Sequence, residues 1–294
     1  MKIDIDEHSG FCYGVIRAIN MAEKLLESRE PVYILGDIVH NELEVERLRK
    51  KGLYTANHSI LEEQGNRKIL IRAHGEPPRT YEKAKINNIT LVDATCPVVI
   101  KLQQKVNKAY HKSLLSGGVI IIYGKKGHAE VVGLMGHAEN KAVVVSSTED
   151  LNTIDVSGAI YLFSQTTMEP EGFYEIEARI REIRRQQGVR ESTPLLVYNT
   201  ICRHVSLRQE YLKKFAEQHD AIIFVAGIQS SNGKSLFKVC KRYNNCSYAV
   251  TEPKDIKPEW FNSANSVGIC GATSTPKWLM ESCGNYILDM VVNN

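Results

Sequence analysis

The chain of 294 residues is 43% hydrophobic and 24% charged, a composition that excludes disordered, collagen-like and coiled-coil proteins. Its net charge of +3 is too small to indicate nucleic-acid binding, and no run of roughly 18 apolar residues indicates a membrane span. The segment Met1 to Glu7 alternates as in a strand and forms no apolar leader, so we expect a cytoplasmic protein of two or three compact units.

The predicted elements follow a pattern that occurs three times along the chain. Cys12, Cys96 and Cys202 each stand where an extended or turn segment gives way to helical spacing of apolar side chains. About 25 residues after each cysteine an apolar strand ends in glycine, and another helical pattern follows. These three strands are predicted at residues 32–36, 119–124 and 221–227.

Polar side chains recur where these strands, and a further strand in each repeat, come to an end. Four residues past the three glycines stand His40, His128 and Ser231. The further strands lead to His74, Thr166 and Ser274. Parallel α/β sheets bind ligands outside the carboxyl ends of their strands. We therefore predict an α/β fold of three small parallel-sheet domains, with strand ends facing a common centre, at residues 1–96, 97–195 and 196–294.

The three repeated cysteines are candidate metal ligands. A helix N-terminus favours the thiolate form, which acts as a nucleophile or as a ligand. Widely spaced cysteines are more often small core residues, but the repeat favours ligation, and three distant thiolates suit a 4Fe-4S cluster with one iron free of protein sulfur. Of the other cysteines, we expect Cys240 and Cys270 in the core and Cys246 and Cys283 at the surface.

The polar positions favour a phosphate ligand. Helix N-termini and glycine-flanked amides bind phosphate, and histidine, serine and asparagine side chains can complete the shell. Each such residue alone would be interpreted as a helix cap, so the argument depends on their recurrence. Because no nucleotide-binding glycine motif occurs, a small phosphorylated metabolite fits better. Glu130, two residues past His128, is the carboxyl group that we nominate as proton donor, whereas Glu42 has the spacing of a solvated helix face.

Eight short motifs run from residue 10 to about residue 280. They are Gly-Phe-Cys at 10–12, Val-His-Asn at 39–41, Ala-His-Gly at 73–75, Asp-Ala-Thr-Cys-Pro at 93–97, Gly-His-Ala-Glu at 127–130, Gln-Thr-Thr at 165–167, Ser-Ser-Asn at 230–232 and Gly-Ala-Thr-Ser-Thr-Pro at 271–276. Together they resemble the motifs of the 4-hydroxy-3-methylbut-2-enyl diphosphate reductase family, iron-sulfur enzymes of the methylerythritol phosphate pathway. The resemblance implies a pseudo-threefold α/β cloverleaf around a central cluster.

The resemblance also implies a reaction and a set of site residues. The reaction is the reductive dehydroxylation of (E)-4-hydroxy-3-methylbut-2-enyl diphosphate to isopentenyl and dimethylallyl diphosphates, the last step of the non-mevalonate isoprenoid pathway. Cys12, Cys96 and Cys202 would hold one 4Fe-4S cluster. The catalytic residues would be Glu130, which carries the proton, Thr166, which orients the substrate hydroxyl or relays that proton, and His128. The substrate-binding residues would be His40, His74, His128, Thr166, Ser230, Ser231, Asn232 and Ser274.

Some features leave the family pattern or leave alternatives open. Asn199 stands where many members have an aspartate, and Val205 replaces a hydroxyl residue, for which we expect Ser206 to compensate. Because no flavin or nicotinamide site is visible, we expect an external one-electron donor such as ferredoxin or flavodoxin. A quinolinate synthase-like iron-sulfur enzyme would need arginine donors for a dicarboxylate, and a non-catalytic iron-sulfur sensor would have no use for Glu130.

Overall fold

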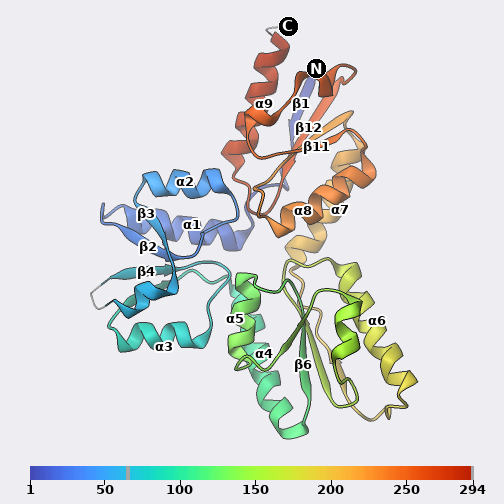
Figure 1. Cartoon of the computed structure of the whole chain (residues 1–294). Helices are drawn as coiled ribbons and strands as arrows, with labels where there is room; N and C mark the ends of the chain where they lie inside the picture. The colour runs from blue at the N-terminus through green and yellow to red at the C-terminus, as the bar shows by residue number, and fades with distance from the viewer. Residues whose placement is uncertain (64–66, 293–294) are drawn as a thin grey trace. The chain divides into compact units, whose positions relative to one another are not determined.

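The computed structural model describes residues 1–63 and 67–292. In these residues the strands form three four-stranded sheets, and every strand pairing with a defined register is parallel. Helices alternate with strands along the chain (Figure 1). This arrangement confirms the predicted α/β fold with three parallel sheets. Among the described residues, no helix is both long enough and apolar enough to cross a membrane.

The first sheet has the strand order β3-β2-β4-β5. Its strands are β2 (Val32–Leu35), β3 (Leu53–Ala56), β4 (Lys68–Ile71) and β5 (Thr90–Asp93). The helices of this stretch are α1 (Tyr13–Leu26), α2 (Glu42–Lys50) and α3 (Pro78–Ile86), with a 3-10 turn at His58–Glu62. Ile69 and Ile71 on β4 pack with Ala84 of α3 in one hydrophobic cluster. The buried strand therefore fixes the position of the loop that follows it.

The second sheet has the order β7-β6-β8-β9. Its elements are α4 (Pro97–Ser116), β6 (Val119–Tyr123), α5 (Ala129–His137), β7 (Val143–Val145), a 3-10 turn (Thr148–Thr153), β8 (Ile160–Ser164), α6 (Pro170–Gln186) and β9 (Leu195–Val197). Helices α4 and α5 lie on one side of β6 and α6 on the other (Figure 1). Ile120 and Ile122 belong to a hydrophobic cluster with α4 and α5, whereas Ile121 belongs to one with α6. Because both faces are covered, β6 is apolar throughout.

The third sheet has the order β1-β12-β10-β11. Its elements are β1 (Lys2–Ile5), α7 (Arg203–Glu217), β10 (Ala221–Val225), α8 (Ser231–Tyr243), β11 (Ser247–Val250), 3-10 turns at Pro253–Asp255 and Pro258–Phe261, β12 (Ser266–Gly271) and α9 (Lys277–Val292). Here too, alternate residues of β10 belong to separate clusters, so the sheet is buried on both faces.

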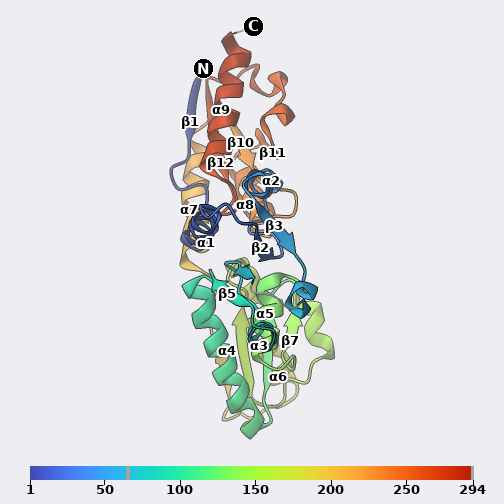
Figure 2. The same ribbon diagram turned by 90° about the vertical axis from the view of Figure 1, so that its left-hand side faces the viewer.

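The three sheets have the same strand order. This order assigns the first strand of the chain to a different sheet from the one that we expected. In each sheet the edge strand that leads into a cysteine (β5, β9 or β1) pairs with the strand that ends in a polar motif (β4, β8 or β12). Strand β1, which we expected in the first domain, therefore belongs to the third sheet, beside β12 (Figure 2). Strand β9 spans the predicted boundary between residues 195 and 196. The domain boundaries themselves stay a prediction.

The described chain groups into two compact parts. The first part comprises Met1–Glu30, Asp37–Leu53 and the chain from Arg203 onward, and it contains the third sheet together with α1 and α2. The second part comprises Pro31–Gly36 and Tyr54–Cys202, and it contains the second sheet and most of the first. The predicted site residues divide between these parts, so we describe the two groups separately.

Candidate functional site

Glu130, Thr166 and Cys202 form a continuous hydrogen-bonded chain in the second part. Glu130 lies in the first turn of α5 and is 1% exposed. Its Oε1 accepts the backbone N–H of Thr166 at 2.7 Å, and its Oε2 accepts the Thr166 hydroxyl at 2.7 Å. The carbonyl oxygen of Thr166 in turn accepts the backbone N–H of Cys202 at 2.8 Å. The predicted proton donor is thus joined to a predicted metal ligand through one threonine.

The environment of Glu130 suits a proton donor at neutral pH. Burial raises the pKa of Glu130 from its usual 4.5 to about 7, although the hydrogen bonds from Thr166 act in the opposite direction. A carboxyl group with a pKa near the working pH is present in both protonation states, so it can donate a proton and then be protonated again. Glu42, the competing carboxyl group, is exposed on α2, as its spacing predicts.

Two histidines lie close to this acid in the same part. His128 caps α5, because its Nδ1 accepts the backbone N–H of Glu130 at 3.2 Å. In the neutral ring the proton then resides on Nε2, so that nitrogen is a hydrogen-bond donor. The ring of His74 meets the ring of His128 edge to face, with 5.2 Å between centroids. The structure therefore brings together two of the predicted diphosphate ligands.

The loop that carries His74 is bound to the loop that carries Cys96. The backbone N–H of Cys96 donates to the carbonyl oxygen of Ala73 at 3.0 Å. Gly75 has φ +72°, and a Cβ there would lie 2.4 Å from Nε2 of Gln103, on the helix that begins after Cys96. Only glycine combines this backbone conformation with so close an approach. The glycine of the Ala-His-Gly motif is therefore required by packing.

A second group of predicted residues meets in the first part, at the carboxyl ends of β10 and β12. Ser230 caps α8 by accepting the backbone N–H of Gly233 at 3.0 Å, and its hydroxyl lies 3.0 Å from that of Ser274. Oδ1 of Asn232 accepts both the backbone N–H of Thr273 (3.0 Å) and its hydroxyl (2.9 Å). Ser231, the first residue of α8, lies between them in the chain.

The amide nitrogen of Asn232 is a buried hydrogen-bond donor. Asn232 is 5% exposed, and its Nδ2 has no hydrogen-bond partner among the residues that the structure describes. A buried donor without a partner costs about 1–3 kcal/mol, so such a group indicates an absent partner. Cys12 is joined to this group, since its backbone N–H donates to the carbonyl oxygen of Thr273 at 3.3 Å.

The turn that carries His40 is fixed by the residue after it and by a glycine. Asn41 caps α2 through a bond from the backbone N–H of Glu44 to its Oδ1, at 3.0 Å. A Cβ at Gly227 would lie 2.4 Å from the carbonyl oxygen of His40 and 3.0 Å from Cα of Asn41. The end of β10 therefore packs directly against the backbone of this turn. The same Gly227 accepts the backbone N–H of Ser230 through its carbonyl oxygen, at 3.1 Å.

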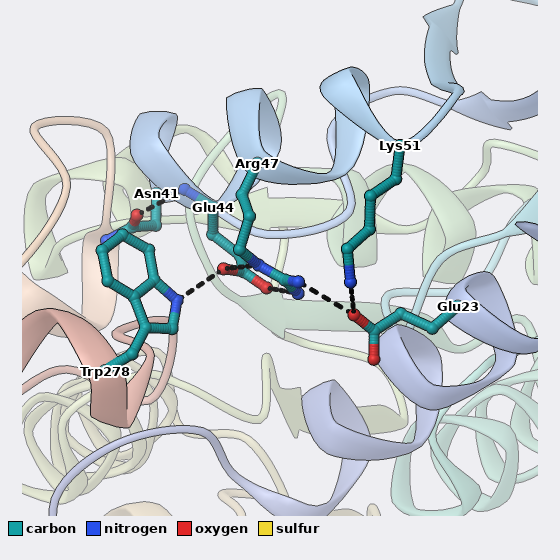
Figure 3. Close-up of polar contacts among 6 residues, drawn as sticks. All are labelled: Glu23, Asn41, Glu44, Arg47, Lys51 and Trp278. Atoms are coloured by element: carbon teal, nitrogen blue, oxygen red, sulfur yellow. Dashed lines mark hydrogen bonds and ion pairs between the residues drawn. The ribbon is translucent and has the colours of Figure 1, made fainter.

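A buried carboxylate links α2 to α9 next to this turn. Glu44 is 1% exposed and accepts two hydrogen bonds from Arg47 at 2.6 and 2.8 Å, as well as one from Nε1 of Trp278 at 2.9 Å (Figure 3). Arg47 and Lys51 also pair with Glu23 on α1. Trp278 follows Ser274 by four residues, so this network connects two of the loops that carry predicted ligands. Nothing in the periodicity of either helix indicated the contact, because its partners are 234 residues apart.

The seven cysteines fall into three exposure classes. Cys12, Cys96 and Cys202 are partly exposed at helix starts, as predicted, and Cys246 is exposed. Cys240 and Cys270 are buried, which confirms them as core residues. The prediction that Cys283 lies at the surface was wrong: α9 turns it into the core, where burial raises the pKa of its thiol to about 12. None of the seven forms a disulfide.

The departures near Cys202 have a structural explanation. Val205 is 6% exposed, so an apolar side chain suits the position. The Ser206 hydroxyl does not take over, because it donates to the carbonyl oxygen of Arg203 in its own helix at 3.1 Å. Instead Thr200, which sequence reasoning missed, binds the segment to the end of β8: its hydroxyl donates to the carbonyl oxygen of Ser164 at 2.6 Å and accepts its N–H at 2.8 Å. Asn199 Oδ1 accepts the N–H of the residue two places on.

Comparisons with known proteins identify the family. The LytB protein family matches residues 3–288, which is nearly the whole chain. The chain belongs to the LytB protein family. Among LytB relatives, the 4-hydroxy-3-methylbut-2-enyl diphosphate reductase of Parabacteroides distasonis is 49% identical over 290 residues, which cover 99% of this chain and 98% of the relative. The reductase of the same name from Bacteroides fragilis is 47% identical over 287 residues, covering 98% and 97%.

Solved LytB structures agree with the fold. One, described as the structure of (E)-4-hydroxy-3-methyl-but-2-enyl diphosphate reductase, the terminal enzyme of the non-mevalonate pathway, is 33% identical, with a TM-score of 0.71 over 98% of this chain and 100% of that chain. A diphosphate reductase from Plasmodium falciparum, at 24% identity, has a TM-score of 0.83 over 97% of this chain and 87% of that one, and supports the fold. The resemblance expected from the motifs is confirmed, and the comparisons do not favour a quinolinate synthase-like enzyme or a sensor.

Proposed function

We propose that this LytB chain catalyses the reductive dehydroxylation of (E)-4-hydroxy-3-methylbut-2-enyl diphosphate, giving isopentenyl and dimethylallyl diphosphates as the last step of the non-mevalonate pathway. The observation that carries the proposal is the hydrogen-bonded chain from Glu130 through Thr166 to Cys202, because it would join a proton donor to a thiol ligand. The full-length relatives that bear the reductase name support it.

The chemistry demands both an acid and a source of electrons. The bond between the allylic carbon and its hydroxyl oxygen breaks, a carbon–hydrogen bond forms, and the oxygen leaves as water, at the expense of two electrons and two protons. Hydroxide is a poor leaving group, so a proton must reach the oxygen as the bond breaks. Glu130 would supply it, and the Thr166 hydroxyl, which donates to Oε2 of Glu130 at 2.7 Å, would orient the substrate hydroxyl or relay the proton.

The donor set fits an iron-sulfur cluster. Cys12, Cys96 and Cys202 are partly exposed thiols at the starts of α1, α4 and α7, where the helix dipole favours thiolates, while Cys240, Cys270 and Cys283 are buried in the core. We assign the first three as ligands of one 4Fe-4S cluster per chain. When bound, such a cluster supplies electrons one at a time and an iron atom that acts as a Lewis acid toward oxygen.

The two groups of polar residues would bind the diphosphate. His40, Ser230, Ser231, Asn232 and Ser274 come from the first part. His74 and His128 come from the second part, where Nδ1 of His128 caps α5. A phosphate oxygen would provide the acceptor that Nδ2 of Asn232 lacks among the described residues. Neutral donors around helix starts suit a diphosphate better than a carboxylate, which favours arginine forks.

The electrons would come from an external one-electron carrier, either ferredoxin or flavodoxin. We place the protein in the cytoplasm, since seven cysteines without a disulfide among them suit a reducing compartment.

The test is an anaerobic preparation analysed for metal, sulfide and turnover. We expect about four iron atoms and four acid-labile sulfides per chain, and conversion of the allylic diphosphate to both products with dithionite-reduced methyl viologen. Zinc without sulfide, under strict exclusion of oxygen, would refute the cluster assignment. A fully loaded cluster without turnover would refute the reductase assignment.

A further inference from the structure

Helix α4 carries an uninterrupted stripe of lysines on its solvent face. The helix begins directly after Cys96 and runs for 20 residues. Its exposed lysines are Lys101, Lys105, Lys108 and Lys112, spaced by four, three and four residues. This spacing places them on one side of a helix, opposite the buried side. The buried side is formed by Val99, Leu102, Gln103, Val106, Ala109, Tyr110 and Ser113.

No negative charge balances this stripe within α4. The helix contains no aspartate or glutamate, and none of its four lysines makes an ion pair with any residue that the structure describes. The other two helices that begin at a candidate cluster ligand differ, since α1 contains Glu23 and α7 contains Glu210 and Glu217. The stripe is therefore particular to the helix that begins at Cys96.

Helix stability does not account for the arrangement. Like charges at positions i and i+4 destabilise an isolated helix by about 0.2–0.5 kcal/mol per pair, and Lys101–Lys105 and Lys108–Lys112 are such pairs. The first turn has no acidic residue to balance the helix dipole. An acidic surface laid against the stripe would relieve the repulsion between the lysines.

We propose that the lysine stripe of α4 is the docking surface for an acidic one-electron carrier protein. The proposal rests on the proposed function, which requires two electrons per turnover and finds no flavin or nicotinamide site in the sequence. With a rise of about 1.5 Å per residue, the stripe starts about 8 Å along the axis from Cys96. Two reduced carriers, each losing one electron, would supply one turnover. A carrier docked here is held beside the thiol end of the helix.

The side chains of this face favour a protein partner over a nucleic acid. The helix has no phenylalanine or tryptophan and its Tyr110 is 3% exposed, so apart from the exposed His111 it offers no ring beside the lysines on which bases could stack. Complementary charge on a protein partner steers encounter and raises the association rate, the effect that a freely exchanging electron carrier needs.

The experiment compares two electron sources in matched variants of the full chain. K101E/K105E reverses two charges of the stripe. K68E/K85E makes the same change in charge at Lys68 and Lys85, which are exposed in the same part of the protein but lie outside α4. Turnover is measured with dithionite-reduced methyl viologen, which needs no docking surface, and with reduced flavodoxin or ferredoxin at about 0.01 M and about 1 M salt, where the Debye length is about 30 and about 3 Å.

We expect K101E/K105E to keep its turnover with methyl viologen and to lose about tenfold in kcat/KM for the carrier at low salt, through a raised KM. The difference from wild type should disappear at high salt, and K68E/K85E should match wild type throughout. An unchanged carrier KM in K101E/K105E would overturn the proposal, as would an equal loss in K68E/K85E.

Two further measurements keep the outcome decisive. If K101E/K105E folds poorly and loses turnover with both sources, K101Q/K105Q replaces it, and full carrier activity in that variant refutes the docking surface. If wild type turns over no substrate with methyl viologen, the proposed function fails, and calorimetric binding of flavodoxin or ferredoxin to wild type and K101E/K105E still tests the surface. Stripe-dependent binding of the carrier supports it. Binding of oligouridylate or anionic vesicles without binding of the carrier overturns it.

Discussion

The Glu130→Gln substitution tests the central acid with little structural disturbance. Glu130 accepts two hydrogen bonds from Thr166, one from the backbone N–H and one from the hydroxyl. Glutamine has the same shape, and its amide oxygen can keep the backbone bond while its NH₂ group donates to the hydroxyl oxygen. The variant therefore preserves the contact and removes only the ability to carry a proton.

The structure gives this acid a definite effect on stability. Burial raises the pKa of Glu130 from 4.5 to about 7, so the folded state binds the proton more tightly than the unfolded state. The resulting stabilisation is fully present below pH 4.5 and is lost as the pH rises through about 7. A change of this size corresponds to roughly 3 kcal/mol. Because a glutamine side chain cannot titrate, the variant should lack this component of the pH dependence.

Denaturant unfolding of wild type and E130Q at pH 5 to 8 measures the effect. We expect the free energy of unfolding of wild type to fall relative to that of E130Q by roughly 2.5 kcal/mol between pH 5 and 8, which is most of the total effect. Turnover of E130Q should fall about 10²- to 10⁴-fold at unchanged iron content. Glu82→Gln, at an exposed position, should match wild type in both assays. Parallel stability curves for wild type and E130Q would refute the burial argument, and unimpaired turnover would refute the proton role.

Three further substitutions test the ligands and the packing. Cys12→Ser should lose cluster iron in anaerobic metal analysis while Cys246→Ser keeps it, and full iron in the first variant would exclude Cys12 as a ligand. Glu44→Ala leaves three donated hydrogen bonds without their acceptor and should cost about 2–3 kcal/mol in denaturant unfolding, so a loss below about 0.5 kcal/mol would contradict the network. Gly227→Ala would push a Cβ to 2.4 Å from the carbonyl oxygen of His40 and should raise the substrate KM about tenfold, an effect that unchanged KM at normal iron content would disprove.

The sequence predicts the fold well because both strand burial and helix starts are local signals. Strands β6 and β10 are covered on both faces, so they appear as unbroken apolar runs. Strand β1 was misplaced for the opposite reason. Its partner β12 lies at the far end of the chain, and nothing within Lys2–Ile5 specifies which sheet it joins. Pairing partners are a property of the whole fold.

The candidate site likewise contains residues that local sequence signals predict and residues that they do not. Glu130, Thr166 and Asn232 could be nominated because they stand at strand ends and helix starts, where polar groups face a ligand. The residues that hold these three side chains in position could not be nominated from the sequence. Thr200 reaches back 36 residues to β8, and Trp278 reaches 234 residues back to Glu44. Such contacts follow from tertiary packing, which no window of sequence contains.

Each of the three cysteines makes the same type of backbone hydrogen bond. This bond explains why the residues that follow each cysteine in sequence can vary. The N–H of Cys96 donates to Ala73, that of Cys202 to Thr166 and that of Cys12 to Thr273. Each acceptor lies in the loop after the strand that pairs with the strand leading into that cysteine. Because the bond is made by the main chain, it does not depend on the side chains that follow the cysteine. Valine at position 205 therefore leaves the place of the Cys202 thiol unchanged, while a substitution that shifts β9 against β8 would move it.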